Sequence, residues 1–315
     1  MPNLHLGINA CFAVKRWPEP ERWLCIVREL GLDCCQFSFD LVDPLLDETI
    51  TFSYADRVRE QAAAEGIFIH SAFTGLAAYS WSQLLHPDKA MREAAMRWYE
   101  RAIDFTARLG APGMGGHIGA FSVQDAADAA RQRLLLAELE QRLVALSRYA
   151  GQRGLRFLLF ENMAVTREWG YSIEQAQQLT SLPLDGVPLV LCLDLGHPCA
   201  LLPVESRYRS LETGTSSADY LAWLNVPWPH TPVLHLQQSD RTGDHHWPFT
   251  AAYNAQGLVQ APAVLNALSH WPATDIYLFL EPIHPFEAED DTVLQDLRES
   301  VQYWRDAMKE SLQTS

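Results

Sequence analysis

The sequence predicts a single (β/α)8 barrel, the TIM-barrel fold, as one domain over residues 1–315. Short apolar runs rich in Val, Ile, Leu and Phe alternate with longer segments of helical periodicity, and there are eight of each. No linker-like or low-complexity segment interrupts this alternation. The turn after the first apolar run, GINACFAV, also lacks the glycine fingerprint of an open dinucleotide-binding sheet. Together these features favour a closed barrel over an open doubly wound sheet.

The eight apolar runs are the expected strands. The last four are continuous apolar segments that end in polar residues, which is typical of strands buried on both faces of a parallel sheet. In chain order, the expected strands are residues 4–10, 34–39, 66–73, 112–118, 156–162, 188–194, 232–238 and 275–281.

One helix is expected after each strand. The segment 86–110 is strongly amphipathic, and Gly110 marks its end because glycine readily adopts the left-handed conformation that stops a helix. In chain order, the expected helices are residues 20–30, 53–65, 86–110, 123–152, 173–181, 217–224, 260–270 and 288–311.

Composition excludes several classes of protein. The net charge is −15 and no Lys/Arg-rich run occurs, so non-specific binding to nucleic acid is disfavoured. No apolar run reaches the 18 residues of a membrane span, and no basic leader precedes the first apolar stretch, so we expect a cytoplasmic protein. The six cysteines contain no CxxC pair, and we expect them to be reduced and buried.

Polar residues stand at the ends of six successive expected strands. In a barrel, these carboxyl ends converge on one mouth, where function is built. Taken singly, His70 is equally consistent with a hydrogen-bonded core residue, Asp194 with a helix N-cap and Glu281 with an exposed strand end. The six strand ends carry His70, His117, Glu161 with Asn162, Asp194, His235 and Glu281.

Converging carboxylates repel one another unless they are paired or bind a cation. We therefore expect Glu161, Asp194, His235 and Glu281 to bind one divalent metal ion. Three carboxylates and one imidazole form an oxygen-rich set. Such a set favours Mn²⁺, with Mg²⁺, Co²⁺ and Zn²⁺ as alternatives.

The segments LLFENM, LCLDLGH, LHLQQSDR and LFLEP lie in this order on the last four expected strands. They resemble the xylose isomerase-like barrel superfamily, which includes sugar (phosphate) isomerases and epimerases, ketose 3-epimerases and the endonuclease IV family. The resemblance covers nearly the whole chain. Resemblance to the ketose 3-epimerases implies the same four metal ligands, with His197 and Arg241 as substrate contacts. Arg167 stands where those enzymes carry a second glutamate, which suggests a phosphorylated or acidic substrate.

A resemblance to endonuclease IV implies an alternative, a zinc phosphodiesterase that acts on abasic DNA. The absence of a basic cluster in a chain of net charge −15 argues against it. The residues that resemble its three-zinc set are His70, His117, Glu161, Asp194, His197, His235, Asp244, His246 and Glu281.

We therefore expect a divalent-metal-dependent sugar or sugar-phosphate isomerase or epimerase of carbohydrate metabolism. On a ketose, Glu161 or Glu281 would remove a proton as general base, the other would return one, and the metal would stabilise the enediolate between these steps. The expected partner is a small-molecule substrate, without nucleic acid or membrane, and a homo-oligomer is possible. The further substrate contacts would be His70, His117, Arg167, His197, Arg241, Asp244 and His246.

Overall fold

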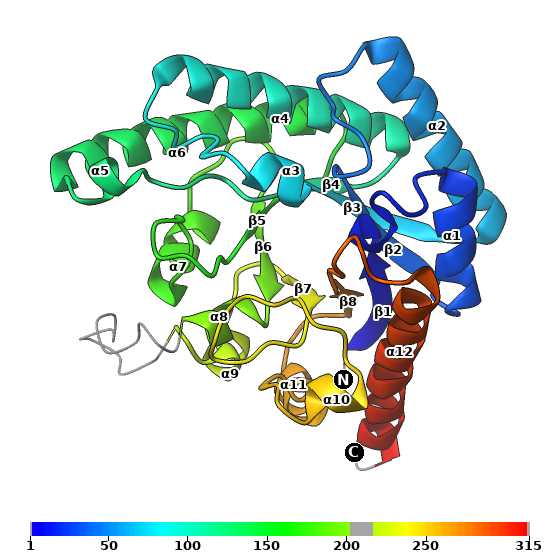
Figure 1. Cartoon of the computed structure of the whole chain (residues 1–315). Coiled ribbons are helices and arrows are strands. Elements are labelled where there is room, and N and C mark those ends of the chain that lie inside the picture. The colour runs from blue at the N-terminus through cyan, green and yellow to red at the C-terminus, as the bar shows by residue number, and fades with distance from the viewer. Residues whose placement is uncertain (1, 202–216, 314–315) are drawn as a thin grey trace.

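A computed structural model describes residues 2–201 and 217–313. Eight parallel strands form a closed barrel in sequential order, and β8 pairs with β1 to close it (Figure 1). The predicted (β/α)8 barrel is thereby confirmed. The strands are β1 (Asn3–Asn9), β2 (Cys34–Ser38), β3 (Phe68–Phe73), β4 (Gly113–Gly116), β5 (Phe157–Glu161), β6 (Leu189–Asp194), β7 (Val233–Leu236) and β8 (Asp275–Leu280).

Helices surround the barrel (Figure 1). The longer ones are α1 (Pro20–Glu29), α2 (Glu48–Glu65), α4 (Lys89–Leu109), α6 (Ala129–Gln152), α7 (Ile173–Thr180), α11 (Ala261–Leu268) and α12 (Asp290–Gln313). The shorter ones are the 3₁₀ helix η1 (Ala10–Ala13), α3 (Gly75–Tyr79), α5 (Val123–Ala126), α8 (His197–Ala200), α9 (Tyr220–Leu224) and α10 (Ala251–Asn254). The extra short helices follow strands, so the expected strict alternation of eight strands and eight helices is too simple.

Helix caps explain where the expected boundaries are wrong. The helix α2 begins five residues before the expected start at 53, because the side chain of Asp47 accepts a hydrogen bond from Thr49 N at 2.9 Å. The expected helix 123–152 is divided into α5 and α6, because Asp128 caps a new helix start. Gly110 ends α4 with a φ of 82°, as its sequence position predicted.

The interior of the barrel changes from apolar to polar along the strands. Successive inward side chains are two residues apart. Leu159 is thus followed by Glu161, and Val233 by His235. The polar residues lie toward the carboxyl ends and form the floor of the mouth. The buried apolar cluster inside the barrel comprises Cys34, Phe73, Leu159, Val190, Cys192, Val233 and Phe279.

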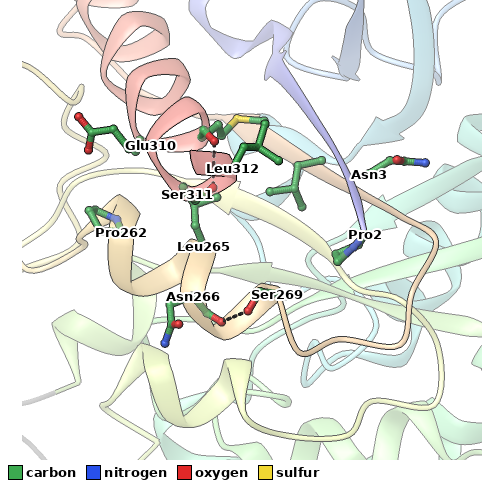
Figure 2. A pocket seen from close by; sticks show the side chains of 12 residues that line it. Pro2, Asn3, Pro262, Leu265, Asn266, Ser269, Glu310, Ser311 and Leu312 are labelled. Atoms are coloured by element: carbon green, nitrogen blue, oxygen red, sulfur yellow. Dashed lines mark hydrogen bonds between the residues drawn. The ribbon is translucent and has the colours of Figure 1, made fainter. Parts of the chain in front are cut away.

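The opposite face of the barrel carries a cavity of about 590 Å³ between the start of β1, α11 and the end of α12 (Figure 2). Leu265 and Leu312 line it, together with Asn3 and Ser269. Among the described residues that line it, Glu310 alone is ionisable, so this part of the structure brings no cluster of ionisable side chains together there. None of the described helices is long and apolar enough to cross a membrane.

Candidate active site

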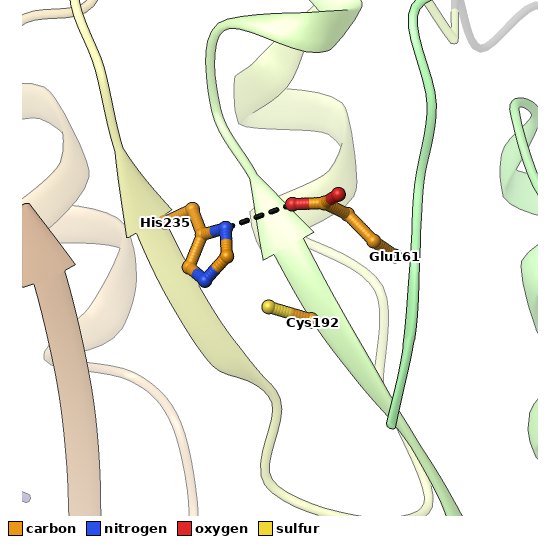
Figure 3. Close-up of side chains that lie close together, drawn as sticks. All are labelled: Glu161, Cys192 and His235. Carbon is orange, nitrogen blue, oxygen red and sulfur yellow. Dashed lines mark hydrogen bonds and ion pairs between the residues drawn. The ribbon is translucent and has the colours of Figure 1, made fainter. Parts of the chain in front are cut away.

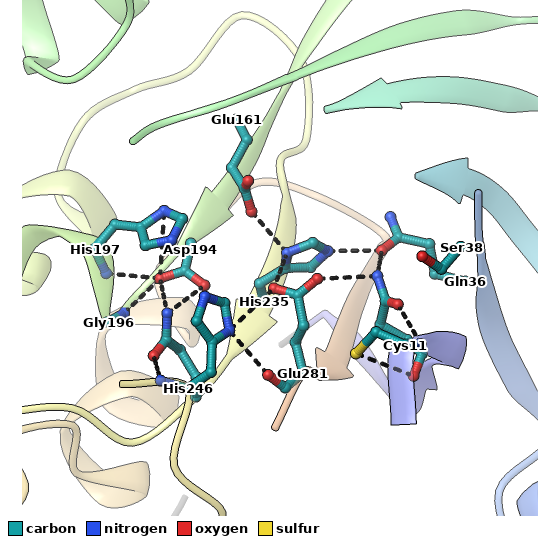
Figure 4. Close-up of polar contacts among 12 residues, drawn as sticks. Cys11, Gln36, Ser38, Glu161, Asp194, Gly196, His197, His235, His246 and Glu281 are labelled. Atoms are coloured by element: carbon teal, nitrogen blue, oxygen red, sulfur yellow. Dashed lines mark hydrogen bonds and ion pairs between the residues drawn. The ribbon is translucent and has the colours of Figure 1, made fainter. Parts of the chain in front are cut away.

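Ionisable side chains from β5 to β8 converge at the mouth of the barrel. His235 Nδ1 lies 2.8 Å from Glu161 Oε1 (Figure 3) and also 2.8 Å from Glu281 Oε2 (Figure 4). Asp194 completes a group in which one ligand atom from each residue lies within 4.8 Å of the others. All four side chains are buried, with relative exposures of 3% or less. The structure therefore brings the four expected metal ligands together.

The charges of this group fit a bound cation. Burial raises the pKa of Glu161. In Glu281 the same burial effect is outweighed by His235, which lowers the pKa of that carboxyl. Burial alone would lower the pKa of His235, but the neighbouring carboxylates of Glu281 and Glu161 raise it well above its usual value. A protonated His235 balances only one negative charge, and Asp194 adds a further buried carboxylate. A divalent cation would neutralise this excess of buried negative charge.

Cys192 offers a different ligand set with Glu161 and His235, since all three lie close together (Figure 3). Burial raises the pKa of the Cys192 thiol to about 12, so it is protonated at neutral pH. Metals bind the thiolate, not the thiol. Asp194, two residues further along β6, is therefore the better ligand from this strand.

Asp194 also shapes the turn that follows β6. Its Oδ1 accepts hydrogen bonds from Gly196 N and His197 N, each at 2.7 Å, within the turn before α8, although the N-cap of α8 is Gly196 and not Asp194. Gly196 must be glycine here, because a Cβ would lie 2.4 Å from the side-chain carbonyl carbon of Gln237. This turn places His197 beside the metal ligands (Figure 4).

A second cluster adjoins the first. Asp244 Oδ2 lies 3.3 Å from His197 Nε2 and 3.4 Å from His246 Nε2. Burial alone would raise the pKa of Asp244, but the two histidines lower it well below its usual value. His246 Nδ1 is 3.7 Å from Glu281 Oε2, which joins the clusters. His246 has a φ of 48°, and such strain in a residue other than glycine is concentrated at functional sites.

His117 also lies at the mouth, directly after β4. Its Nδ1 is 3.5 Å from Glu161 Oε2, and its ring contacts Tyr79. Burial lowers the pKa of His117 to about 3, so the imidazole is neutral. A neutral ring can donate or accept a hydrogen bond from a substrate hydroxyl.

The prediction that His70 belongs to the mouth is wrong. His70 lies inside β3, where the pairing with β2 shifts by one residue between Ile69 and Ser71. This bulge was not visible in the sequence pattern, and β3 continues for three more residues. The His70 ring packs on Phe157 and Tyr277, toward the amino ends of β5 and β8. Burial lowers its pKa to about 3, as expected for the alternative of a core histidine.

The two expected arginines differ in position. Both are exposed, Arg167 in the loop after β5 and Arg241 in the loop after β7. Arg167 lines a cavity beside the mouth, whereas Arg241 lines neither that cavity nor the one over the metal ligands. The geometry therefore supports a place near the substrate for Arg167 only.

Two cavities meet at the mouth. The deeper one, of about 30 Å³, lies over Glu161 and Glu281 and is as large as one water's share of the liquid. The outer one measures about 270 Å³. They share Tyr79, His117 and Met163, so they are adjacent. The arrangement can hold one ion at the bottom and a small molecule above it.

Glu168 faces the outer cavity and was missed by the sequence pattern. Its side chain is buried, with 5% relative exposure, and its Oε2 has no hydrogen-bond partner among the described residues. Burial raises the pKa of Glu168 to about 7. The six-residue spacing from Glu161 singled out Arg167, but the chain turns the next residue inward. Glu168, one position later, is therefore the buried acidic residue of this loop.

Gln237 was also missed, although its spacing could have revealed it. It follows His235 by two residues, so its side chain points to the same side of the strand. Gln237 Nε2 donates to Asp194 and to Asp244 Oδ1, the latter at 2.9 Å. Its Oε1 accepts from His246 N at 2.7 Å. Gln237 thus connects the metal-ligand group to the cluster around Asp244 and fixes their relative position.

Comparisons with known proteins agree with this architecture. The chain is 25% identical over 310 residues to D-erythrulose 1-phosphate 3-epimerase of Brucella abortus, covering 96% of this chain and 95% of that protein. A candidate xylose isomerase from Rhodospirillum rubrum superposes with a TM-score of 0.87 at 31% sequence identity, covering 96% of this chain and 99% of that one. An L-ribulose 3-epimerase superposes with a TM-score of 0.67 at 17% identity, covering 100% and 95%, which is a likeness of fold.

A family model described as the xylose isomerase-like TIM barrel matches residues 25–307. The match spans most of the chain and includes all the strands from β2 to β8. It confirms the resemblance seen in the four strand-end segments. This chain belongs to the xylose isomerase-like TIM barrel family.

Proposed function

We propose that this protein is a divalent-metal-dependent epimerase that inverts carbon 3 of a short, phosphorylated ketose. The observation that carries the proposal is the convergence of Glu161 and Glu281 on one atom, His235 Nδ1, at 2.8 Å each. These carboxylates come from β5 and β8, which are separated by β6 and β7 in the barrel. A substrate between them would present opposite faces to two bases, as inversion requires.

The metal would be held by Glu161, Asp194, His235 and Glu281, and we favour Mn²⁺ for this oxygen-rich set. When bound, a divalent ion would polarise the carbonyl and the adjacent hydroxyl of the ketose. It would thereby acidify the proton on carbon 3, which carries that hydroxyl and adjoins the carbonyl. We further propose that residues 1–315 form one domain around this site.

The residues of the chain would then divide the remaining work. Either Glu161 or Glu281 removes the proton at carbon 3, and the other delivers a proton to the opposite face. The pKa of His197 is raised well above its usual value, because Asp194 and Asp244 outweigh the opposing effect of burial. A protonated His197 would donate a hydrogen bond to the substrate oxygen on which negative charge develops.

The outer cavity supports a small substrate. Its 270 Å³ is below the volume of about 300–1,000 Å³ that is usual for pockets of larger ligands. Glu168 would accept a hydrogen bond from a substrate hydroxyl, and Arg167 at the exposed rim would contact a phosphate. The Brucella abortus relative is an epimerase of a ketose phosphate, which favours this substrate class.

The proposal can be tested with metal-stripped protein and protein reloaded with Mn²⁺. Both would be assayed with D-erythrulose 1-phosphate and with neutral ketoses such as L-ribulose and D-tagatose. We expect the carbon-3 epimer of the phosphorylated ketose, formed only after reloading. An aldose product would indicate an isomerase instead. Three bound zinc ions together with cleavage of an abasic-site duplex would establish the endonuclease alternative.

A further inference from the structure

Two buried amides connect β1 and β2 to the metal ligands. Asn9 Nδ2 donates to Gln36 Oε1 at 2.7 Å and to Glu281 Oε1 at 3.0 Å. Gln36 Oε1 lies 2.7 Å from His235 Nε2, on the side of the ring opposite the carboxylates (Figure 4). Gln36 Nε2 donates to Ser71 Oγ at 3.0 Å. All these side chains except that of Glu281, which is 3% exposed, have 0% exposure, so water does not replace any of these contacts.

The orientation of the Asn9 amide follows from its partners. Asn9 Oδ1 accepts a hydrogen bond from Cys11 N at 2.9 Å, and a backbone N–H can only donate. With Oδ1 on that side, the amide nitrogen of Asn9 lies on the other side, 3.0 Å from Glu281 Oε1 and 2.7 Å from Gln36 Oε1. The NH₂ group of Asn9 must therefore face Glu281 and Gln36.

This orientation fixes that of the next amide. Because Asn9 presents an N–H group, Gln36 must present its oxygen. The hydroxyl of Ser71 accepts from or donates to either end of an amide, so it imposes no orientation of its own. The same Gln36 oxygen faces His235 Nε2, which must therefore carry a hydrogen. In a neutral imidazole the lone pair then lies on Nδ1, the nitrogen next to Glu161 and Glu281.

We propose that Asn9 and Gln36 are positioning residues that hold His235 in the tautomer whose Nδ1 binds the metal. The inference rests on the metal site proposed above. Asn9 acts on two ligands at once, because it also binds Glu281 Oε1 and leaves Oε2 to face His235. If Gln36 lost its acceptor, the proton could move to Nδ1, and the ring would no longer offer a lone pair to the metal.

The first test measures Zn²⁺ binding to the metal-stripped full-length protein by competition with a chromophoric chelator. Gln36→Leu keeps much of the volume but removes the acceptor, and we expect Zn²⁺ affinity to fall about 10–100-fold. Gln36→Glu retains an oxygen for both Asn9 and His235 and should restore binding. Ser71→Ala, the matched control, removes the other contact of Gln36 and should leave the affinity unchanged. Circular dichroism of each stripped variant verifies the fold.

Asn9→Asp gives a sharper result because charge and orientation predict opposite changes. A new carboxylate near a cation would by itself strengthen metal binding. It would also turn the NH₂ group of Gln36 toward position 9 and toward His235, and so favour the wrong tautomer. We expect weaker Zn²⁺ binding, and stronger binding would overturn the inference.

Nitrogen-15 NMR of histidine-labelled, Zn²⁺-loaded protein reads the tautomer directly, with His235 assigned by the His235→Gln variant. We expect a hydrogen on Nε2 and none on Nδ1. A hydrogen on Nδ1, or equal Zn²⁺ affinity in the wild type and Gln36→Leu, would overturn the role of the two amides alone. A wild-type protein that binds no Zn²⁺ would instead overturn the metal site and the proposed function with it.

Discussion

Glu168→Gln should remove a pH-dependent loss of stability of about 3 kcal/mol. Burial raises the pKa of Glu168 from the ordinary 4.5 to about 7, a difference of about 2.5 pH units. At about 1.4 kcal/mol per unit, this comes to about 3 kcal/mol. Between these two pH values the folded protein holds a proton that the unfolded chain has released, so stability falls as the pH rises. Below pH 4.5 both states are protonated and the loss disappears.

The assay is urea unfolding of the metal-stripped protein at about pH 5 and about pH 8. Any penalty for burying the amide of glutamine is the same at both pH values, so the difference between them isolates the charge. The gain of Glu168→Gln over wild type should be larger at the higher pH. Glu140→Gln, which removes a carboxylate from the exposed surface of α6, is the matched control. An equal effect of Glu168→Gln at both pH values would refute the argument.

A role in substrate binding would explain why the protein retains Glu168 although this residue lowers its stability. Glu168 lines the outer cavity, and its buried Oε2 lacks a hydrogen-bond partner among the described residues. A substrate hydroxyl would supply the missing donor, so the binding of substrate would recover part of the loss. Glu168→Gln should therefore raise KM as well as stability, a combination that is common where activity requires a strained site.

Three further perturbations separate the roles of other residues. Arg167→Ala should raise KM for a ketose 1-phosphate about tenfold while leaving that of a neutral ketose unchanged, and equal effects would mean that Arg167 does not contact the phosphate. Mn²⁺ affinity, measured by calorimetry, should decrease as the pH is lowered from about 8 to about 6, because the raised pKa of His235 lets a proton compete with the metal for its ligand nitrogen. An affinity independent of pH would contradict this. His70→Phe should change the unfolding midpoint and leave kcat/KM unaltered, since the ring packs on Phe157 and Tyr277; a selective loss of activity would return His70 to the site.

The features that could be predicted from sequence are those set by strong, local patterns. The continuous apolar runs before Glu161 and Asp194 exist because these strands are buried on both faces, so both the strands and their polar ends were visible. Helix starts were less visible. The capping bonds of Asp47 and Asp128 are local, but aspartate also favours turns, so its presence alone does not fix where a helix begins. Element types were therefore predicted better than their boundaries.

The remaining site residues depend on register, which the sequence does not carry. A one-residue bulge at His70 separates it from the mouth, although its apolar surroundings resemble those of the true strand ends. In the loop after β5, the chain buries Glu168 and exposes Arg167, which reverses the order expected from spacing. Asn9 and Gln36 were overlooked because uncharged amides on early strands have no pattern of their own. Their importance appears only when β1 and β2 lie beside β8 and His235.

Transfer of the carbon-3 proton in D₂O tests most directly whether Glu161 and Glu281 share the chemistry. Mn²⁺-loaded wild-type protein, incubated with the ketose phosphate, should place deuterium at carbon 3 of the product. Glu161→Gln and Glu281→Gln should each abolish turnover, and one of them should still exchange the carbon-3 proton of a single epimer. If both variants bind Mn²⁺ as the wild type does and exchange this proton at the wild-type rate, the two carboxylates are ligands only and the account is wrong.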